Sequence, residues 1–174
     1  MHTKFKNNHN DESHKGFTLI ELLIVLVTSA IIFLLGFANY RSYQKRQYME
    51  TAVRQVLSDL RLTQEYALGG KKPTEPVGNP CETTALRGYN FIRDAATGTS
   101  YSIQAVCVGG MVDIKLQVAL PPGVDMLMTG GDILQFQILG KGVNRTATIT
   151  LRWPDGGVNN KQIQVTNGGQ IREL

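Results

Sequence analysis

Histidine is scarce in this chain of 174 residues. All three histidines, His2, His9 and His14, lie within its first 14 residues. The rest of the chain therefore cannot form the Ser–His or Cys–His pairs that activate many nucleophiles. A metal site is also not expected in residues 15–174, because they contain no histidine and only two cysteines. We expect no catalytic residue, no metal site and no cofactor, so the sequence does not predict an enzyme.

Cysteine is almost as rare as histidine. Cys81 and Cys107 both lie far from the N-terminus. In an oxidising compartment the two can form a disulfide, and the alternative is a pair of buried free thiols.

A strong excess of charge is also missing. The formal net charge is +4, which is too small to indicate a nucleic-acid-binding protein by itself. A local basic patch is still compatible with this value.

One long apolar run dominates the sequence. Residues 16–38 read GFTLIELLIVLVTSAIIFLLGFA, with Glu21 as the only charged residue. As a helix, residues 17–38 extend roughly 33 Å, close to the ~30 Å of a bilayer core. Lys15 precedes the run and predicts a cytoplasmic N-terminus by the positive-inside rule.

The single carboxylate in this run requires an explanation. An ionised carboxylate at the centre of a membrane helix costs roughly 2.5–3.5 kcal/mol on insertion scales. One interpretation is an ordinary signal peptide or anchor that tolerates Glu21 near the membrane surface.

The residues at the start of the run favour another interpretation. The stretch GFTLIELLIVL resembles the type III signal of type IV pilins and type II secretion pseudopilins. The resemblance implies that a prepilin peptidase removes residues 1–16 by cleaving after Gly16. It also implies N-methylation of Phe17 and a role in assembly for Glu21, the fifth residue of the mature chain.

The chemistry of the new N-terminus fits this role. Cleavage exposes the amine of Phe17, which is mainly cationic at neutral pH. Burying that amine and a carboxylate among apolar helices is unfavourable unless the two charges pair. A pair between Glu21 of one subunit and the amine of another forms in one axial register, so it selects that register.

The helix is expected to continue beyond the apolar run. Residues 39–68 contain neither glycine nor proline. Gly69 and Gly70 end this segment, and Pro73 prevents its renewal. Residues with helical spacing form one amphipathic stripe, expected to pack on the protein's own globular domain: Met49, Val53, Val56, Leu60, Thr63 and Ala67.

Residues 69–174 are expected to form a β-rich domain. Apolar and polar residues alternate in short runs separated by turns, which is typical of half-buried antiparallel strands. The expected strands are 89–93, 101–107, 112–118, 132–139, 146–153, 163–165 and a short segment at Ile171. The predicted fold class is α+β: a long N-terminal helix packed on a C-terminal antiparallel β-sheet or sandwich, as in pilins.

The C-terminal half also resembles H-type pseudopilins and FimT/FimU-like minor pilins. The shared features are an LPPGV break, an ITL strand and a final IQVTNGGQIREL hairpin. Some DNA-uptake members have a Gly-Arg-X-Arg tail, whereas residues 169–172 read Gly-Gln-Ile-Arg and keep only the second of the two arginines. The missing charge argues against DNA binding.

The resemblance implies a minor pilin or pseudopilin of an inner-membrane-based filament, with the alternative of a pilus-tip module that binds DNA or a secreted substrate. The implied partners are other pilin subunits, the prepilin peptidase, the inner-membrane assembly platform and the lipid bilayer. The implied location is the inner membrane, crossed once, with the C-terminal domain on the periplasmic or extracellular side.

Overall fold

A computed structural model describes residues 16–174, without the side chains of residues 35–39. The expected leader, residues 1–16, therefore lies outside the described residues except for Gly16. The chain divides into two compact units, with the boundary between Tyr40 and Arg41.

The longest element is helix α1, Leu19–Leu68. It ends at Leu68, as expected from the glycines that follow. Gly70 has a left-handed φ of 59°, which glycine adopts without steric cost. The N–H groups of Gly70 and Lys71 donate to the carbonyls of Ala67 and Tyr66, so the helix closes with a Schellman motif.

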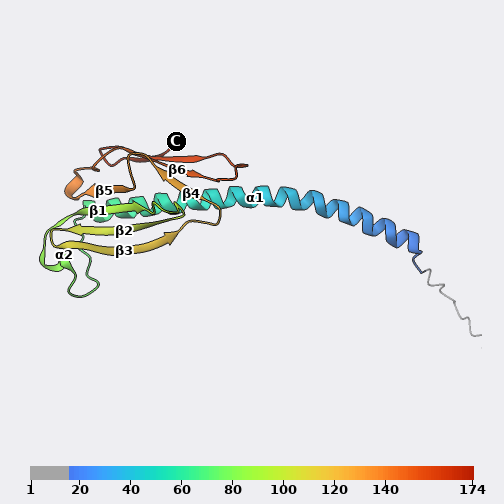
Figure 1. Ribbon diagram of the computed structural model, residues 1–174, viewed down its shortest axis with the longest axis horizontal. Helices are drawn as coiled ribbons and strands as arrows, with labels where there is room; N and C mark the ends of the chain where they lie inside the picture. Colours follow the sequence, from blue (N-terminus) through green and yellow to red (C-terminus); the bar gives the residue numbers. More distant parts are fainter. Residues whose placement is uncertain (1–15) are drawn as a thin grey trace, which may run out of the picture. The chain divides into compact units, whose positions relative to one another are not determined.

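The second unit contains every β-strand of the described residues (Figure 1). Sheet A has the strand order β3-β2-β1-β5 and sheet B the order β4-β6-β7-β8, and every pairing is antiparallel. The elements of sheet A are β1 (Leu86–Arg93), β2 (Ser100–Cys107), β3 (Gly110–Ala119) and β5 (Ile133–Gln137). Those of sheet B are β4 (Asp125–Met128), β6 (Ala147–Arg152), β7 (Lys161–Val165) and β8 (Ile171–Glu173). Two short helices, α2 (Pro80–Thr83) and the 3-10 helix η1 (Ile138–Gly140), complete the unit.

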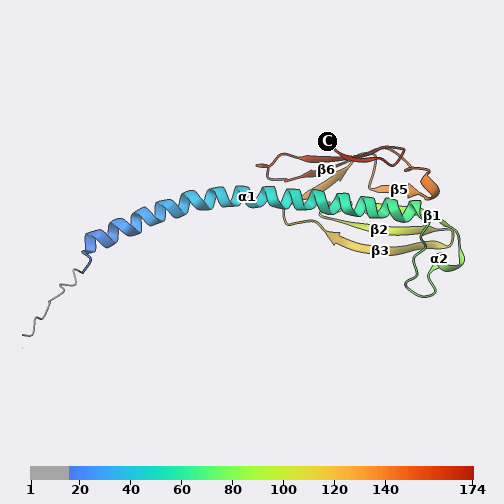
Figure 2. The same ribbon diagram turned by 180° about the vertical axis from the view of Figure 1, so that it is seen from behind.

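Both sheets share one core with the second half of α1. In Figures 1 and 2, β2 and β3 lie below this part of α1 and β6 lies above it. The predicted stripe is confirmed, because all six of its residues are buried. The sheets contribute alternate side chains to the core, which include Tyr89, Phe91, Tyr101, Ile103, Leu134, Phe136, Met126, Ile149, Leu151 and Ile163.

Several expected boundaries were wrong. β1 begins at Leu86 instead of Tyr89. The expected strand 132–139 covers only Ile133–Gln137 and is followed by η1, in which Leu139 has a left-handed φ of 58°. That backbone conformation is incompatible with a continuing strand.

Besides η1, two elements were not expected. β4 follows the Pro121-Pro122-Gly123 turn, which had been interpreted only as a break in the sheet; its four residues pair with β6. α2 lies between the expected helix end at residue 68 and the first expected strand at residue 89, where no element was predicted. Its N-cap is Asn79, whose side chain accepts a hydrogen bond from Cys81, and Pro80 occupies its first position. Asn before Pro is a recognised helix-start signal.

Candidate functional site

The described residues of the expected cleavage junction are exposed. Gly16 is exposed, and Phe17 exposes 81% of its surface. A Cβ built on Gly16 would have no heavy atom of the described residues within 4 Å, apart from those of its chain neighbours. The fold itself therefore gives no steric reason for glycine at this position, so any requirement for a small residue must come from another molecule.

The first turn of α1 gives Thr18 and Glu21 defined positions. The hydroxyl oxygen of Thr18 accepts a hydrogen bond of 3.3 Å from the backbone N–H of Glu21. Thr18 directly precedes the helix, and Glu21 is its third residue. This spacing is that of a capping box, in which a Ser or Thr cap is followed three residues later by Glu or Gln. Sequence reasoning missed this pattern, although the Thr-x-x-Glu spacing was visible.

Glu21 also suits the first turn electrostatically. Carboxylates are favourable near helix N-termini, where the backbone dipoles leave a partial positive charge. The Glu21 side chain is exposed, and no salt bridge joins it to any residue in 16–174. Its carboxylate is therefore accessible to a group from outside the chain.

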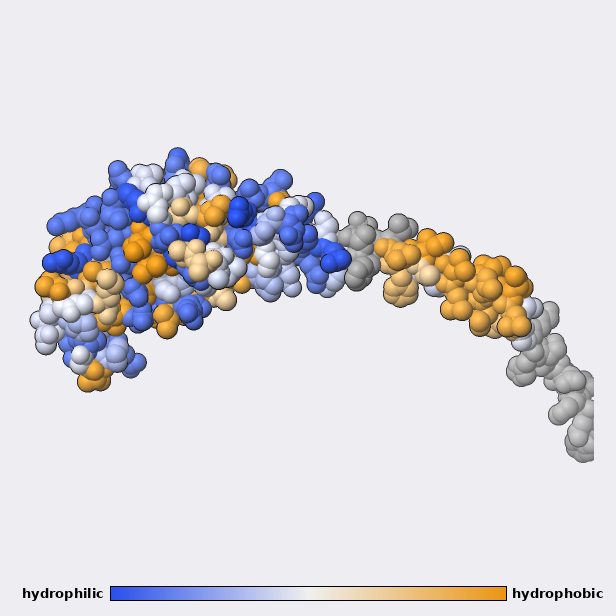
Figure 3. Space-filling view, viewed as in Figure 1, coloured by the Kyte–Doolittle hydropathy of each residue, from blue (hydrophilic) through white to orange (hydrophobic). Residues whose placement is uncertain are grey.

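The helical turns around and after Glu21 carry apolar side chains on every side, with Thr28 and Ser29 as the polar exceptions. Each large hydrophobic residue described here exposes more than half of its surface. Figure 3 shows the hydrophobic residues of this segment in orange on the face in view. The exposed residues are Leu19, Ile20, Leu22, Leu23, Ile24, Val25, Leu26, Val27, Ile31, Ile32, Phe33 and Leu34. A helix that is hydrophobic all round is normally covered by other helices or by lipid. Within the part of the chain that the structure describes, no helix meets the length and hydropathy required to cross a membrane.

Thr28 keeps its polar group satisfied within this apolar segment. Its hydroxyl lies 2.9 Å from the carbonyl oxygen of Ile24 and 3.1 Å from that of Val25. A hydroxyl bonded to the preceding turn does not need water as a partner, so Thr28 is compatible with apolar surroundings.

The second unit contains a buried carboxylate that sequence reasoning overlooked. Asp59 exposes 5% of its surface. The Tyr101 hydroxyl donates to one carboxylate oxygen at 2.8 Å, and the Lys115 ammonium donates to the other at 2.6 Å. Burial and the hydrogen bond to Asp59 both raise the pKa of Tyr101. This network joins α1 to β2 and β3 of sheet A.

Asp59→Ala is expected to lower the free energy of unfolding by about 2–4 kcal/mol, because it leaves the buried Tyr101 hydroxyl without its acceptor and Lys115 without its counter-charge. Asp59→Asn retains an acceptor and should lose less. Lys115→Gln removes only the counter-charge of Asp59 and so isolates the contribution of the ion pair. Urea unfolding of the detergent-solubilised chain measures the three values, and equal stability of Asp59→Ala and wild type would contradict the assigned role.

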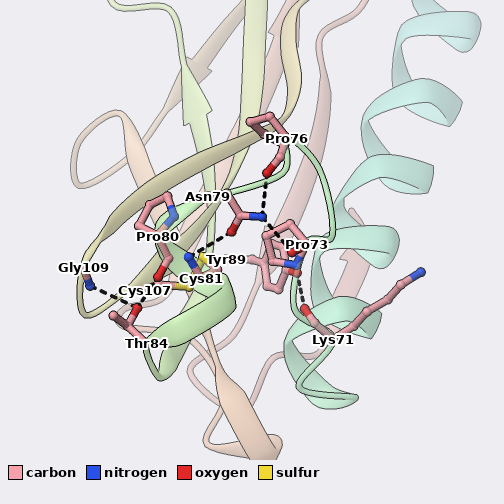
Figure 4. Close-up of a disulfide and its surroundings, with 10 residues drawn as sticks. All are labelled: Lys71, Pro73, Pro76, Asn79, Pro80, Cys81, Thr84, Tyr89, Cys107 and Gly109. Carbon is pink, nitrogen blue, oxygen red and sulfur yellow. Dashed lines mark hydrogen bonds between the residues drawn. A yellow bond between two sulfur atoms is a disulfide. The ribbon is translucent and has the colours of Figure 1, made fainter.

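Cys81 and Cys107 form a disulfide, with Cα atoms 5.3 Å apart (Figure 4). It ties α2 to the end of β2. The Asn79 amide supports the same region by donating to the carbonyls of Pro73 and Pro76 at 3.2 Å and 3.0 Å. The connector between α1 and β1 is thus fastened by one covalent bond and several hydrogen bonds.

Replacing both cysteines by alanine is expected to lower the free energy of unfolding by about 3–4 kcal/mol, since the bond closes a loop of 26 residues. Urea denaturation under non-reducing conditions measures the loss. Reductant should reproduce it in the wild type and should have no effect on the double variant. A loss well below 1 kcal/mol would mean that the disulfide contributes little to stability.

Two comparisons place these features among known proteins. The family model described as the prokaryotic N-terminal methylation motif matches residues 13–37. Two crystal structures of the Pseudomonas aeruginosa type IV minor pilin FimU have a similar fold at 11% sequence identity. One matches with a TM-score of 0.50 over 72% of this chain and 91% of FimU, and the other with 0.53 over 76% and 92%. No match was found among curated protein sequences.

The class of protein follows from the fold and the motif together. A long N-terminal helix packs on antiparallel sheets, which confirms the predicted α+β pilin fold. The methylation motif lies at the predicted junction. The resemblance to type IV pilins drawn from the sequence is therefore confirmed.

Proposed function

We propose that this chain is a minor pilin or pseudopilin, matured by cleavage after Gly16 and N-methylation of Phe17. It then enters a filament assembled at the inner membrane. The observation that carries the proposal is the first half of α1, whose apolar side chains are exposed on every side. Such a helix needs lipid before assembly and other apolar helices afterwards.

The apolar helix occupies two environments, one after the other. Before assembly, residues 17–38 anchor the chain in the inner membrane, with the second unit on the periplasmic or extracellular side. During assembly the same residues pack against equivalent helices of other subunits, with the assembly platform and the prepilin peptidase as transient partners. Thr28 is compatible with both environments, since its hydroxyl is bonded within the helix.

Glu21 supplies the specificity that apolar packing lacks. Exposed leucines, isoleucines and valines pack in many registers with similar energy. A carboxylate that must meet the Phe17 amine of a neighbour penalises every register in which both charges are left unpaired. The accessible Glu21 side chain of the described structure is consistent with this role.

The proposed function is tested by fractionating cells that produce the full chain. Membranes are separated from sheared filaments, and the chain is quantified in both fractions. We expect processed chain in the membrane and in the filament fraction, below the amount of the most abundant subunit. A chain found only in the soluble fraction, or in membranes but never in filaments, would contradict the proposal.

A further inference from the structure

The start of the second unit carries basic and aromatic side chains on one short stretch of α1. Lys45 is half-buried and Arg46 is exposed. Tyr43 exposes 59% of its surface and Tyr48 exposes 38%. At about 3.6 residues per turn these four side chains surround α1 at one level of the helix instead of sharing one face. Together with Trp153 of the β6–β7 connection, they are here named the basic–aromatic surface.

Trp153 contacts both α1 and the LPPGV turn. The Lys45 ammonium lies 5.1 Å from the centroid of its ring, within the range of a cation–π contact. A Cβ at Gly123 would lie 2.5 Å from two atoms of the same ring, and Gly123 has a left-handed φ of 82°. Only glycine fits this position, so the close approach of the LPPGV turn fixes the ring that Lys45 contacts.

Other charged side chains of the second unit form salt bridges with one another. Lys161 lies 3.0 Å from Glu173 and 3.1 Å from Glu50, and these hydrogen bonds raise the pKa of Lys161. Arg152 lies 4.0 Å from Asp125. By contrast, no carboxylate within residues 16–174 lies within salt-bridge distance of Lys45 or Arg46. Both cations can therefore serve a ligand from outside the chain.

We propose that the basic–aromatic surface docks on the headgroups of anionic phospholipids. This inference rests on the proposed function, because it requires residues 17–38 to anchor the chain in a bilayer. Residues 43–48 follow that segment within the same helix, so chain connectivity brings them to the level where the lipid headgroups begin. Each Lys or Arg near an anionic surface contributes about 1 kcal/mol of attraction.

The aromatic residues favour a lipid surface over an acidic protein partner. Tyr and Trp are enriched where a chain passes from hydrocarbon to water, since their rings are apolar and their N–H or O–H groups are polar. An acidic partner would explain Lys45 and Arg46 but not the adjacent rings. Lipid docking also explains why cations follow the apolar segment on the side where the positive-inside rule disfavours them.

Trp153 provides the test, because it is the only tryptophan in the chain. The full-length mature protein is reconstituted into vesicles of phosphatidylcholine alone or of phosphatidylcholine and phosphatidylglycerol in equal amounts. Both contain a trace of phospholipid with a nitroxide on its headgroup. Quenching of Trp153 fluorescence reports proximity to the headgroups, and flotation of the vesicles reports anchoring separately.

Three variants are compared by their ratios of quenched to unquenched fluorescence. Arg46→Gln leaves the Lys45–Trp153 contact in place, and Lys45→Gln/Arg46→Gln removes both cations. Lys72→Gln/Arg87→Gln removes two exposed cations elsewhere on the second unit and is the matched control.

We expect stronger quenching in the anionic vesicles, a decrease on adding salt, and a fall in the docked-to-undocked ratio of about fivefold for each cation removed from the surface. The control should behave like wild type. Equal quenching in both vesicle types, or no effect of Lys45→Gln/Arg46→Gln, would overturn the inference while flotation still supported anchoring. Filament incorporation lost in that variant, with quenching independent of lipid charge, would overturn it in favour of a protein partner. Failure to float with either vesicle would instead contradict the proposed function.

Discussion

Glu21→Ala is expected to reduce incorporation into filaments by tenfold or more while leaving membrane insertion unimpaired. Insertion should not suffer, because the substitution removes the most costly group from the apolar segment. Assembly should suffer, because the Phe17 amine of a neighbouring subunit loses its counter-charge; leaving one member of a buried pair alone costs about 3–5 kcal/mol. The measurement is the ratio of filament-associated to membrane-associated chain, with processing followed in parallel.

The capping box makes the choice of controls important, since Glu21 also lies in the first turn of α1. Thr18→Ala removes the hydrogen bond from the Glu21 N–H and should cost about 1 kcal/mol of helix stability without affecting the charge pair. Glu21→Gln keeps the shape and the capping pattern but removes the charge. We expect Glu21→Gln to resemble Glu21→Ala in assembly and Thr18→Ala to resemble wild type. If a fully processed Glu21→Gln chain assembled like wild type, the carboxylate would have no role in assembly.

Gly16→Leu is expected to abolish maturation almost completely. Apart from its chain neighbours, no described atom lies within 4 Å of a Cβ at this position, so the substitution should not disturb the fold. The expected block therefore arises in the peptidase, which by resemblance requires a small residue before the cut. The measurement is the ratio of uncleaved to cleaved chain in membranes.

Gly16→Ala is the matched control for this prediction. It adds one methyl group and should be cleaved better than Gly16→Leu. The stability of the second unit should be the same in both variants and in wild type. Normal cleavage of the Gly16→Leu chain would mean that Gly16 is not part of the recognised junction.

Local patterns predicted much of the fold. The buried stripe of α1 followed from residues at helical spacing, and the end of the helix followed from Gly69 and Gly70. These features depend on residues close together in the sequence. The order of strands in the two sheets depends on pairings between distant segments, such as β1 with β5, and no local pattern determines these.

The register of β3 is another feature that local sequence patterns do not predict. Leu116 lies in an alternating run, yet it exposes 65% of its surface. The ladder between β2 and β3 shifts register near this residue, and Gln117 has a left-handed φ of 49°. An extra residue in one strand turns the following side chains to the other face. Alternation alone does not show where such a bulge falls.

The sequence identified the residues of the candidate site but not their local geometry. Gly16, Phe17 and Glu21 were identified from the apolar run and its resemblance, and the cap formed by Thr18 was overlooked. Asp59 was overlooked for a different reason. It falls at helical spacing within the buried stripe, but Tyr101 and Lys115, which satisfy its carboxylate, are 42 and 56 residues away. A buried charge can be interpreted only when its partners are known.

The proposed maturation of the chain is tested most directly by the identity of its first residue in the membrane. Intact-mass and N-terminal peptide mass spectrometry of the membrane-extracted protein measure this residue and its modification. We predict a chain that begins at Phe17 and carries one added methyl group on its amine, with residues 1–16 absent. A mature chain that begins at Met1, or one cleaved after Ala38, would contradict the account.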